Sequence, residues 1–322
     1  MAEWLVEDGI GEQRAILLDG EEIVAARIAW LGELIAGTVA DAKLISRRAG
    51  ATRGTALVGG EEVLVDRLDP SITEGTTVRI EITRAAIAEP GRRKRARGRL
   101  STAEPIRPDI MATIPADGHA VRTVRQFPVP GWNDLVVDAF TGQVDFEGGS
   151  LELSAAAAMT LIDVDGAMPA SELAVAAVPA IARSIRRMDI SGSIGIDFPT
   201  LPQKADRKTV DMALAGALTG FRHEATAMNG FGFVQIVARS HGPSILQRAR
   251  WQPHETAARL LLRQAERIDE PGTLKLTARQ GVLDTIESDW LESLARRTGR
   301  KIETKADPGL AITGGFAQAV AS

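Results

Sequence analysis

Two short segments carry aspartates in a pattern that suits metal binding. In Thr160–Gly166 and Gly195–Pro199, apolar residues run into a carboxylate and then a turn, which puts Asp163 and Asp197 at strand ends. A carboxylate at the carboxyl end of a buried strand is held rigidly and still faces a crevice. Magnesium prefers such hard oxygen ligands and completes its shell with water and phosphate oxygens. Asp163 and Asp197 are therefore our candidate metal ligands, with Mg2+ as the expected ion and Mn2+ as its substitute.

Asp165 extends this pattern. It follows Asp163 by two residues, so in a strand its side chain points to the same side and could bring a third oxygen to the metal. Asp163 and Asp197 are 34 residues apart, which leaves room for one helical crossover between neighbouring strands. The same spacing also fits ordinary strand-end acids that make turn and cap hydrogen bonds. Spacing alone favours that simpler interpretation.

Other catalytic patterns are absent from the sequence. The histidines form no HxH or HExxH spacing, no serine stands in a G-x-S-x-G elbow, and no G-x-x-x-x-G-K-[ST] phosphate loop occurs. We interpret the histidines as surface or hydrogen-bonding residues: His119, His223, His241 and His254. Because the chain contains no cysteine, disulfides, thiolate metal sites and a cysteine nucleophile are excluded as well.

Size and composition predict a folded protein of several modules. The chain has 322 residues, of which 44% are hydrophobic and 25% charged, values typical of globular proteins. No apolar run approaches the roughly 20 residues that span a bilayer, and the N-terminal residues show no signal pattern. We therefore expect a cytoplasmic protein with no membrane contact.

The elements that must hold the aspartates alternate between strand and helix. Beyond residue 148, apolar strands are separated by helical segments, which predicts an α/β layer. The helix predicted over Ala174–Met188 contains Pro179, which should kink it or split it in two. The helix over Lys208–Phe221 carries one apolar stripe and serves packing. A strand, a helix and a second strand after Gly272 predict a small α/β appendix.

The first hundred residues predict a small β-barrel that ends in a basic run. Short apolar strands recur at a spacing of roughly 10 residues between turn residues. Residues 91–99 then contain six Lys and Arg and no acid. Composition leaves two interpretations of this run open, a solvated surface loop and a nucleic-acid contact. The Pro-rich stretch from residue 101 to about 146 is interpreted as a connector with a few strands.

The segments around both aspartates resemble the ribonuclease E/G family. Gly148–Leu153 followed by Met159–Asp165 is similar to that family's Gly-Gly-Ser strand and its Thr-x-Ile-Asp-x-Asn/Asp motif. Asp189–Phe198 resembles its Gly-Gly-x-x-x-Ile-Asp-Phe segment. Met228–Arg239 resembles the family's next strand, and Gly242–Leu246 the close of its core. The resemblance is good over residues 148–248 and fainter over 37–99, which look like the family's OB-fold insertion.

This resemblance implies a magnesium-dependent endonuclease that cuts single-stranded or structured RNA. Asp163 and Asp197 would form the metal-binding pair, and Asp165 would orient the attacking water or the metal. The implied RNA-binding residues, including the basic run, are Arg84, Arg92, Arg93, Lys94, Arg95, Arg97, Arg99, Lys204, Arg207 and Arg239.

The implied fold class is a multidomain α+β or α/β protein. We expect N-terminal strands that pack on the core (1–30), an OB-like barrel (31–100), and a connector with a reduced RNase H-like or sensor region (101–147). An α/β nuclease core (148–250) and a C-terminal helix with a small α/β appendix (251–322) complete the chain.

The chain departs from the family pattern at several positions. Ala157 stands where the family usually has an acid, and Leu57 and Val65 stand at OB-fold positions that present aromatic rings. Without rings, RNA binding would rely more on arginines and would depend strongly on salt. Residues 100–147 are too short for the family's 5′-monophosphate pocket, so we interpret the echo of its motif at Val121–Thr123 as coincidence. Without cysteine the family's zinc-linked dimer should not form, so any oligomer, such as a homodimer, needs another interface.

Three functions remain open at this point. The first is an endoribonuclease, and the second is an RNA-binding protein of the same descent that has lost most or all cleavage. The third is a metal-dependent phosphoesterase for small substrates, which would leave the basic run of residues 91–99 without a role.

Overall fold

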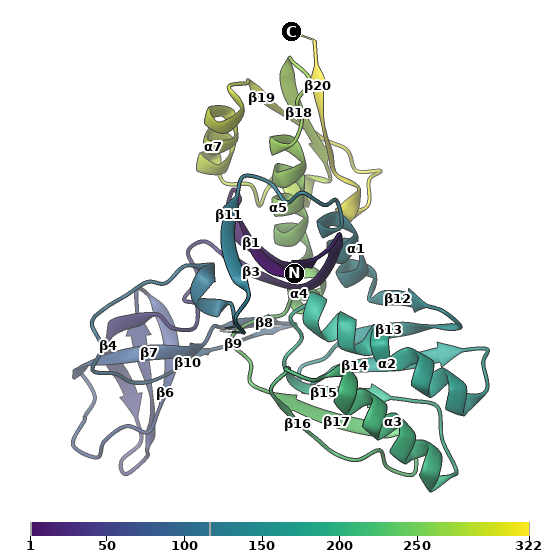
Figure 1. Ribbon diagram of the computed structural model, residues 1–322. Helices are drawn as coiled ribbons and strands as arrows, with labels where there is room; N and C mark the ends of the chain where they lie inside the picture. The colour runs from purple at the N-terminus through teal and green to yellow at the C-terminus, as the bar shows by residue number, and fades with distance from the viewer. Residues whose placement is uncertain (1, 116, 322) are drawn as a thin grey trace.

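The chain folds into three lobes that meet around its N-terminal strands (Figure 1). The computed structural model describes residues 2–115 and 117–321. Figure 1 shows a barrel at the lower left, a sheet with two long helices at the lower right, and a C-terminal module at the top. The mixed α+β class and the closed barrel near the N-terminus confirm the predicted fold class.

The barrel is closed by five strands in the order β10-β6-β5-β4-β7. Its interior is apolar because alternate residues of each strand point inward, as in Ala42, Leu44, Val63 and Ile80. The strands are β4 (Val39–Arg47), β5 (Arg53–Val58), β6 (Glu61–Asp66), β7 (Thr77–Arg84) and β10 (Ala96–Leu100). A hairpin of β8 (Ile87–Glu89) and β9 (Arg92–Lys94) lies between β7 and β10 in the chain. The basic run is therefore mostly strand rather than loop.

The N-terminal strands form a separate sheet in the order β11-β1-β2-β3. Its members are β1 (Glu3–Asp8), β2 (Glu12–Asp19), β3 (Glu22–Trp30) and β11 (Ala120–Val124). A 3-10 turn, η1 (Ile110–Thr113), precedes β11. This sheet buries Leu5 and Ile16 in the same apolar core as the central sheet, which fixes the two sheets against each other.

The central sheet holds the predicted metal ligands. Its six strands follow the order β12-β13-β14-β15-β17-β16. They are β12 (Gln143–Phe146), β13 (Gly149–Ala155), β14 (Thr160–Gly166), β15 (Gly192–Asp197), β16 (His223–Ala225) and β17 (Phe233–Ala238). The neighbours β14 and β15 run parallel, because the helical crossover between them returns the chain to the same end of the sheet.

Two helices cover one face of this sheet, α2 (Ala170–Arg187) and α3 (Lys204–Ala217). Figure 1 shows them side by side in front of the strands. The predicted split at Pro179 is wrong, since α2 is continuous through it. Pro179 removes the hydrogen bond to the carbonyl of Val175, but both residues lie on the exposed side of the helix, where water can satisfy that carbonyl.

The connector contains one helix that the sequence analysis missed, α1 (Trp132–Thr141). It is short, and it is anchored by Trp132 and Leu135, which are fully buried. Two consecutive helices then link the central sheet to the C-terminal module, α4 (Ile245–Trp251) and α5 (Pro253–Glu266). The Ser244 and Gln247 side chains form a reciprocal capping box that fixes the start of α4.

The C-terminal module is a three-stranded sheet in the order β19-β18-β20, packed on α5. Its elements are β18 (Thr273–Ala278), α6 (Gln280–Leu283), α7 (Ser288–Thr298), β19 (Ile302–Ala306), η2 (Ile312–Gly314) and β20 (Phe316–Val320). Among the helices that the structure describes, none has the length and apolar character needed to cross a bilayer.

Candidate active site

The two aspartates singled out by their spacing are direct neighbours on adjacent strands. In the parallel pairing of β14 with β15, the Cα partner of Asp163 is Asp197. Neighbouring strands lie about 4.8 Å apart, and partners in register project from the same face. The expectation that their strands lie side by side is confirmed. The metal-binding role of the pair remains a prediction.

Alternation along the strands sends these acids to the face that α2 and α3 leave open. Ile162 and Val164 of β14 are buried among the helices, whereas Asp163 and Asp165 are exposed. Asp197 at the end of β15 is exposed in the same way. Asp165 also accepts a hydrogen bond from the Gly166 backbone N–H at 2.8 Å, so it makes the turn contact that the simpler interpretation predicted.

Glu152 joins the acids as a residue that the sequence analysis missed. In the antiparallel pairing of β13 with β14, its Cα partner is Asp163, and its side chain is exposed. Glu152, Asp163 and Asp197 therefore form a row across three neighbouring strands. The signal in the sequence was weak, because Glu152 is a single acid within an alternating strand and its neighbours in space are distant in the chain.

The residues of this row fit magnesium. Magnesium binds proteins through one or two carboxylates and keeps waters and substrate phosphates in its remaining positions. Asp163 and Asp197 offer two carboxylates on an exposed face with room for both. Across residues 2–115 and 117–321, no group of three or more His, Asp or Glu side chains is placed so that it could hold a metal ion, so the protein would supply no more than two carboxylates.

Comparison with protein families identifies the segment that carries these acids. Residues 109–240 match the model of the Ribonuclease E/G family. The similarity to this family is thus established for that segment of the 322-residue chain. A search of the curated proteins found no match. The matched residues run from η1 to just beyond β17 and contain the whole central sheet. The family is one of ribonucleases, and the row of Glu152, Asp163 and Asp197 lies within the matched residues.

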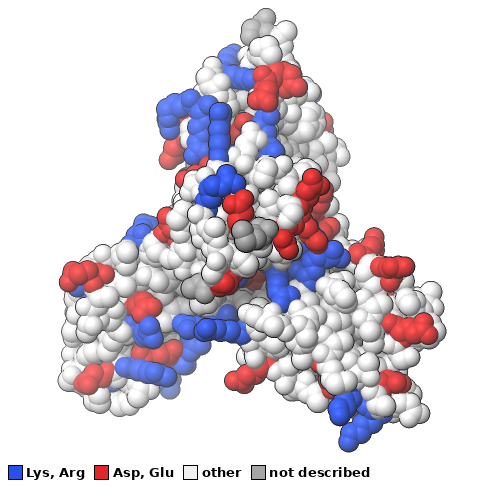
Figure 2. Space-filling model, in the orientation of Figure 1, with Lys and Arg blue, Asp and Glu red and all other residues white. Residues whose placement is uncertain are grey.

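The basic run, residues 91–99, lies outside the matched segment and is paired with acids of the barrel. Two of these contacts join Arg95 to Glu62 at 2.5 Å and Arg99 to Glu81 at 2.8 Å. The other pairs are Arg92–Glu89, Lys94–Glu89, Arg93–Glu61 and Arg97–Asp66. Figure 2 shows the positive and negative side chains intermixed over the barrel. Glu89 is buried in its two pairs, whereas the other four pairs are at least partly exposed and contribute little to stability.

Arg84 and Glu89, near the β8–β9 hairpin, are more buried than the exposed arginines of that hairpin. Arg84 donates to the carbonyl of Ala85 and, at 2.5 Å, to that of Arg95, and partial burial lowers its pKa. Burial opposes ionisation of Glu89, but hydrogen bonds from Arg92 and Lys94 outweigh this and lower its pKa. Glu89 thus holds the hairpin together, and Arg84 supports its backbone more than it faces solvent.

The three predicted phosphate contacts outside the barrel lie in different settings. Arg207 donates to the carbonyls of Leu201 and Pro202, at 2.6 and 3.0 Å, and so braces the loop after β15. Lys204, at the start of α3, and Arg239, just after β17, are both exposed. The structure does not bring these three together with the barrel cations into one cluster.

Two of the sequence departures can now be located. Val65 is fully buried in the barrel, so the prediction that it occupies a base-facing surface position is wrong. Leu57 is exposed, in agreement with such a position. Ala157 lies in the exposed loop between β13 and β14, at the opposite end of β14 from Asp165, so this departure takes no ligand from the acid pair.

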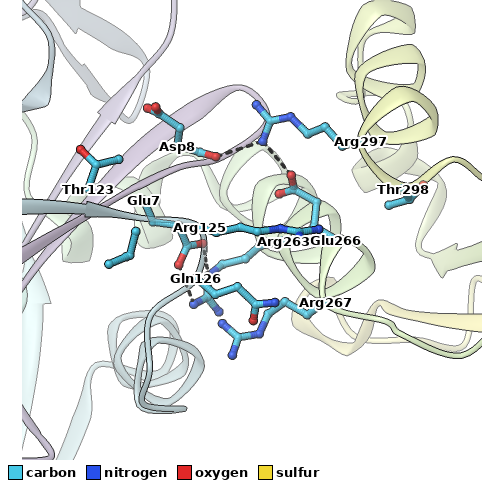
Figure 3. Close-up of a pocket in the computed structure, with 11 residues that line it drawn as sticks. Glu7, Asp8, Thr123, Arg125, Gln126, Arg263, Glu266, Arg267, Arg297 and Thr298 are labelled. Atoms are coloured by element: carbon cyan, nitrogen blue, oxygen red, sulfur yellow. Dashed lines mark hydrogen bonds and ion pairs between the residues drawn. The ribbon is translucent and has the colours of Figure 1, made fainter.

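A cavity of about 500 Å³ lies away from the acids, between β1, β11, α5 and α7 (Figure 3). Four of the seven charged residues that line it are paired with one another. Glu7 contacts both Arg14 and Arg263 at 3.0–3.1 Å, and Arg297 contacts Glu266 at 2.7 Å. These pairs join the N-terminal sheet to α5 and the C-terminal module.

Proposed function

We propose that this chain is a magnesium-dependent endoribonuclease that hydrolyses phosphodiester bonds of single-stranded RNA. The observation that carries the proposal is the register of Asp163 with Asp197 on the open face of the central sheet, inside the segment that matches the family. Two adjacent carboxylates on an uncovered sheet face suit a reaction whose substrate is a long chain, because the chain can lie across the face and does not have to enter a pocket.

Each acid has a distinct role in this proposal. Asp163 and Asp197 hold the metal, and Asp165 orients the attacking water or the metal-bound shell. Magnesium, for which manganese can substitute, supplies charge neutralisation on the phosphodiester and an activated water. The exposed cations Lys204 and Arg239 and the barrel arginines contact phosphates along the RNA. We further propose that the protein acts in the cytoplasm.

The test is cleavage of a labelled single-stranded RNA by the purified chain. Wild type, Asp163→Asn and Asp197→Asn are compared with magnesium and with EDTA, and RNA binding is measured in parallel. Asp206→Asn is the matched control, because Asp206 belongs to α3 on the covered side of the sheet. We expect each site variant to lose on the order of 10²-fold or more in rate while it still binds RNA, since removal of a preorganised charge costs about that much.

The outcomes separate the alternatives. Full activity in Asp163→Asn or Asp197→Asn would show that the acid pair is not the active site. Tight RNA binding by a wild type that does not cleave would establish the RNA-binding function instead. Loss of activity in Asp206→Asn to the same degree would mean that the substitutions act through folding.

A further inference from the structure

Aromatic rings are distributed in an unusual way for a protein of the proposed function. Residues 31–100, which include all strands of the barrel, contain no Phe, Trp or Tyr. Single-stranded RNA is commonly held by stacking of its bases on aromatic side chains. If bases are stacked at all, the rings must come from elsewhere in the molecule.

The most exposed large apolar side chain of the described residues is Phe231, at 81%. It belongs to the turn that leads into β17. Asn229 Oδ1 accepts hydrogen bonds from the backbone N–H groups of Phe231 and Phe233, at 2.9 and 3.1 Å. The backbone of Phe231 is thus fixed although its ring faces solvent.

Gly232 locks the same turn against the acid-bearing strand. Its φ is +93°, and a Cβ at this position would clash with the carbonyl oxygen of Phe198. The Gly232 carbonyl accepts a hydrogen bond from Phe198 N–H at 3.2 Å. Phe198 follows Asp197 directly, so the turn that presents Phe231 is bound to the end of β15 where the acid pair lies.

A second ring continues this surface on the sheet itself. Phe233 is the Cα partner of Asp197, and its ring lies over Gly195, where a Cβ would stand 2.6 Å from Phe233 Cζ. The same hypothetical Cβ would stand 2.9 Å from Leu161 Cδ2, so Leu161 and Phe233 meet above Gly195. Leu161 is 39% exposed. The lack of a side chain at position 195 lets the ring lie close to the strand.

We propose that Phe231, Phe233 and Leu161 form a nucleobase-binding platform beside the acid pair. The platform stacks a base that flanks the phosphodiester held at Asp163 and Asp197, and it replaces the rings that the barrel lacks. Single exposed apolar residues are normal on protein surfaces. Here Phe233 and Leu161 lie on the acid-bearing face by strand register, and the turn that carries Phe231 is hydrogen-bonded to the end of β15. The three side chains of the platform are uncharged, and the face of a nucleobase is neutral, so the two can stack. The charged phosphate would lie at the neighbouring acid pair. The inference rests on the proposed function, because it assumes an RNA substrate.

The first experiment detects stacking without cleavage. Short single-stranded RNAs carry 2-aminopurine at one position at a time, and binding to Asp197→Asn is followed by 2-aminopurine fluorescence. We expect quenching at one or two adjacent positions. The quenching should disappear when Phe231→Ala is added, and affinity should fall by about five- to 100-fold, the usual range for loss of one stacking ring. Phe231 is exposed, so this substitution should not disturb folding.

The matched control is Phe316→Ala, which removes a ring that is also exposed, at 42%, on β20 of the C-terminal module. It should leave both quenching and affinity unchanged. Quenching that survives Phe231→Ala, or that is lost equally in Phe316→Ala, would overturn the proposal.

The second experiment uses the active chain and an RNA with an abasic nucleotide at the quenched position. For wild type, we expect the abasic RNA to be cut with a lower kcat/KM than the intact RNA. For Phe231→Ala the two RNAs should be cut equally, because the ring and the base act as one pair. If the abasic nucleotide lowers kcat/KM by the same factor in Phe231→Ala as in wild type, the ring and the base act independently, which would contradict the platform. If quenching depends on Phe231 but the protein does not cleave RNA, the platform stands and the proposed nuclease activity is refuted. If the protein cleaves RNA equally well with and without the Phe231 ring, the nuclease stands and the platform is refuted.

Discussion

At the level of single residues, the row of Glu152, Asp163 and Asp197 sets the electrostatics of the site. All three carboxylates project from the open face of neighbouring strands. Antiparallel partners have Cα atoms about 4.5–5.5 Å apart, so the charge of Glu152 would act on the cation that we propose at Asp163 even without contact. Its effect should therefore be on metal affinity rather than on the chemical step.

Glu152→Gln should raise the magnesium concentration required for half-maximal cleavage by about threefold to tenfold, with little change in the maximal rate. This change is the one expected when a single negative charge is removed at that distance from the cation in a solvent-exposed site. A magnesium titration of the cleavage rate measures it. Glu224→Gln, an exposed glutamate on edge strand β16 of the same sheet, is the control and should leave the titration unchanged. A large fall in maximal rate would instead make Glu152 part of the chemistry.

At the level of elements, the β8–β9 hairpin and β10 present cations that the barrel partly neutralises. The ion pairs of Arg93 with Glu61 and of Arg95 with Glu62 link β9 and the turn after it to β6. The arginines are more than half exposed in both pairs. RNA bound at these arginines, as we propose, would have to displace Glu61 and Glu62, so these acids would lower the affinity for RNA.

The double variant Glu61→Gln/Glu62→Gln should bind single-stranded RNA more tightly than wild type. Its affinity should also depend more steeply on salt, by about 0.7 in the slope of log K against log salt for each arginine freed. Binding isotherms over a range of potassium chloride concentrations test this. The control Glu21→Gln/Glu270→Gln changes net charge equally at exposed positions outside the barrel. Equal tightening in both variants would mean that only the net charge matters.

At the level of the whole molecule, one stack of side chains docks the C-terminal module on the N-terminal sheet. The Arg259 guanidinium lies 3.9 Å from the Trp30 ring centroid and 4.5 Å from that of Trp290, and burial lowers its pKa to about 10. Arg259 Nε donates to the Gly11 carbonyl at 3.2 Å. Trp290 comes so close to Gly11 that a Cβ there would stand 2.6 Å from its ring.

Gly11→Ala should therefore destabilise the fold more than Gly20→Ala. Both glycines have positive φ, +73° and +62°, so both variants incur the left-handed backbone cost of about 1–2 kcal/mol. Only Gly11 faces Trp290, whereas a Cβ at Gly20 meets nothing within 4 Å. We expect an additional loss of about 1–3 kcal/mol in Gly11→Ala, as for overpacking. Urea denaturation of both variants gives the difference, and equal losses would show that Trp290 moves aside freely.

Local pattern was enough to predict much of this protein. Alternation and turn residues located most strands, and an apolar run ending in an acid pointed to Asp163 and Asp197. These inferences hold because they depend on neighbours in the chain. The continuous path of α2 through Pro179 was missed because it depends on which side of the helix faces solvent.

Residue type and local spacing were sufficient for the two strand-end aspartates, the barrel and the absence of cysteine chemistry. Only the tertiary structure showed which residues lie next to these aspartates and next to the basic run. Strand pairing placed Glu152 and Phe233 next to the acids, and barrel closure paired the basic run with Glu61, Glu62 and Glu81. Register joins residues that are far apart in the chain, and local spacing carries little information about which strands become neighbours.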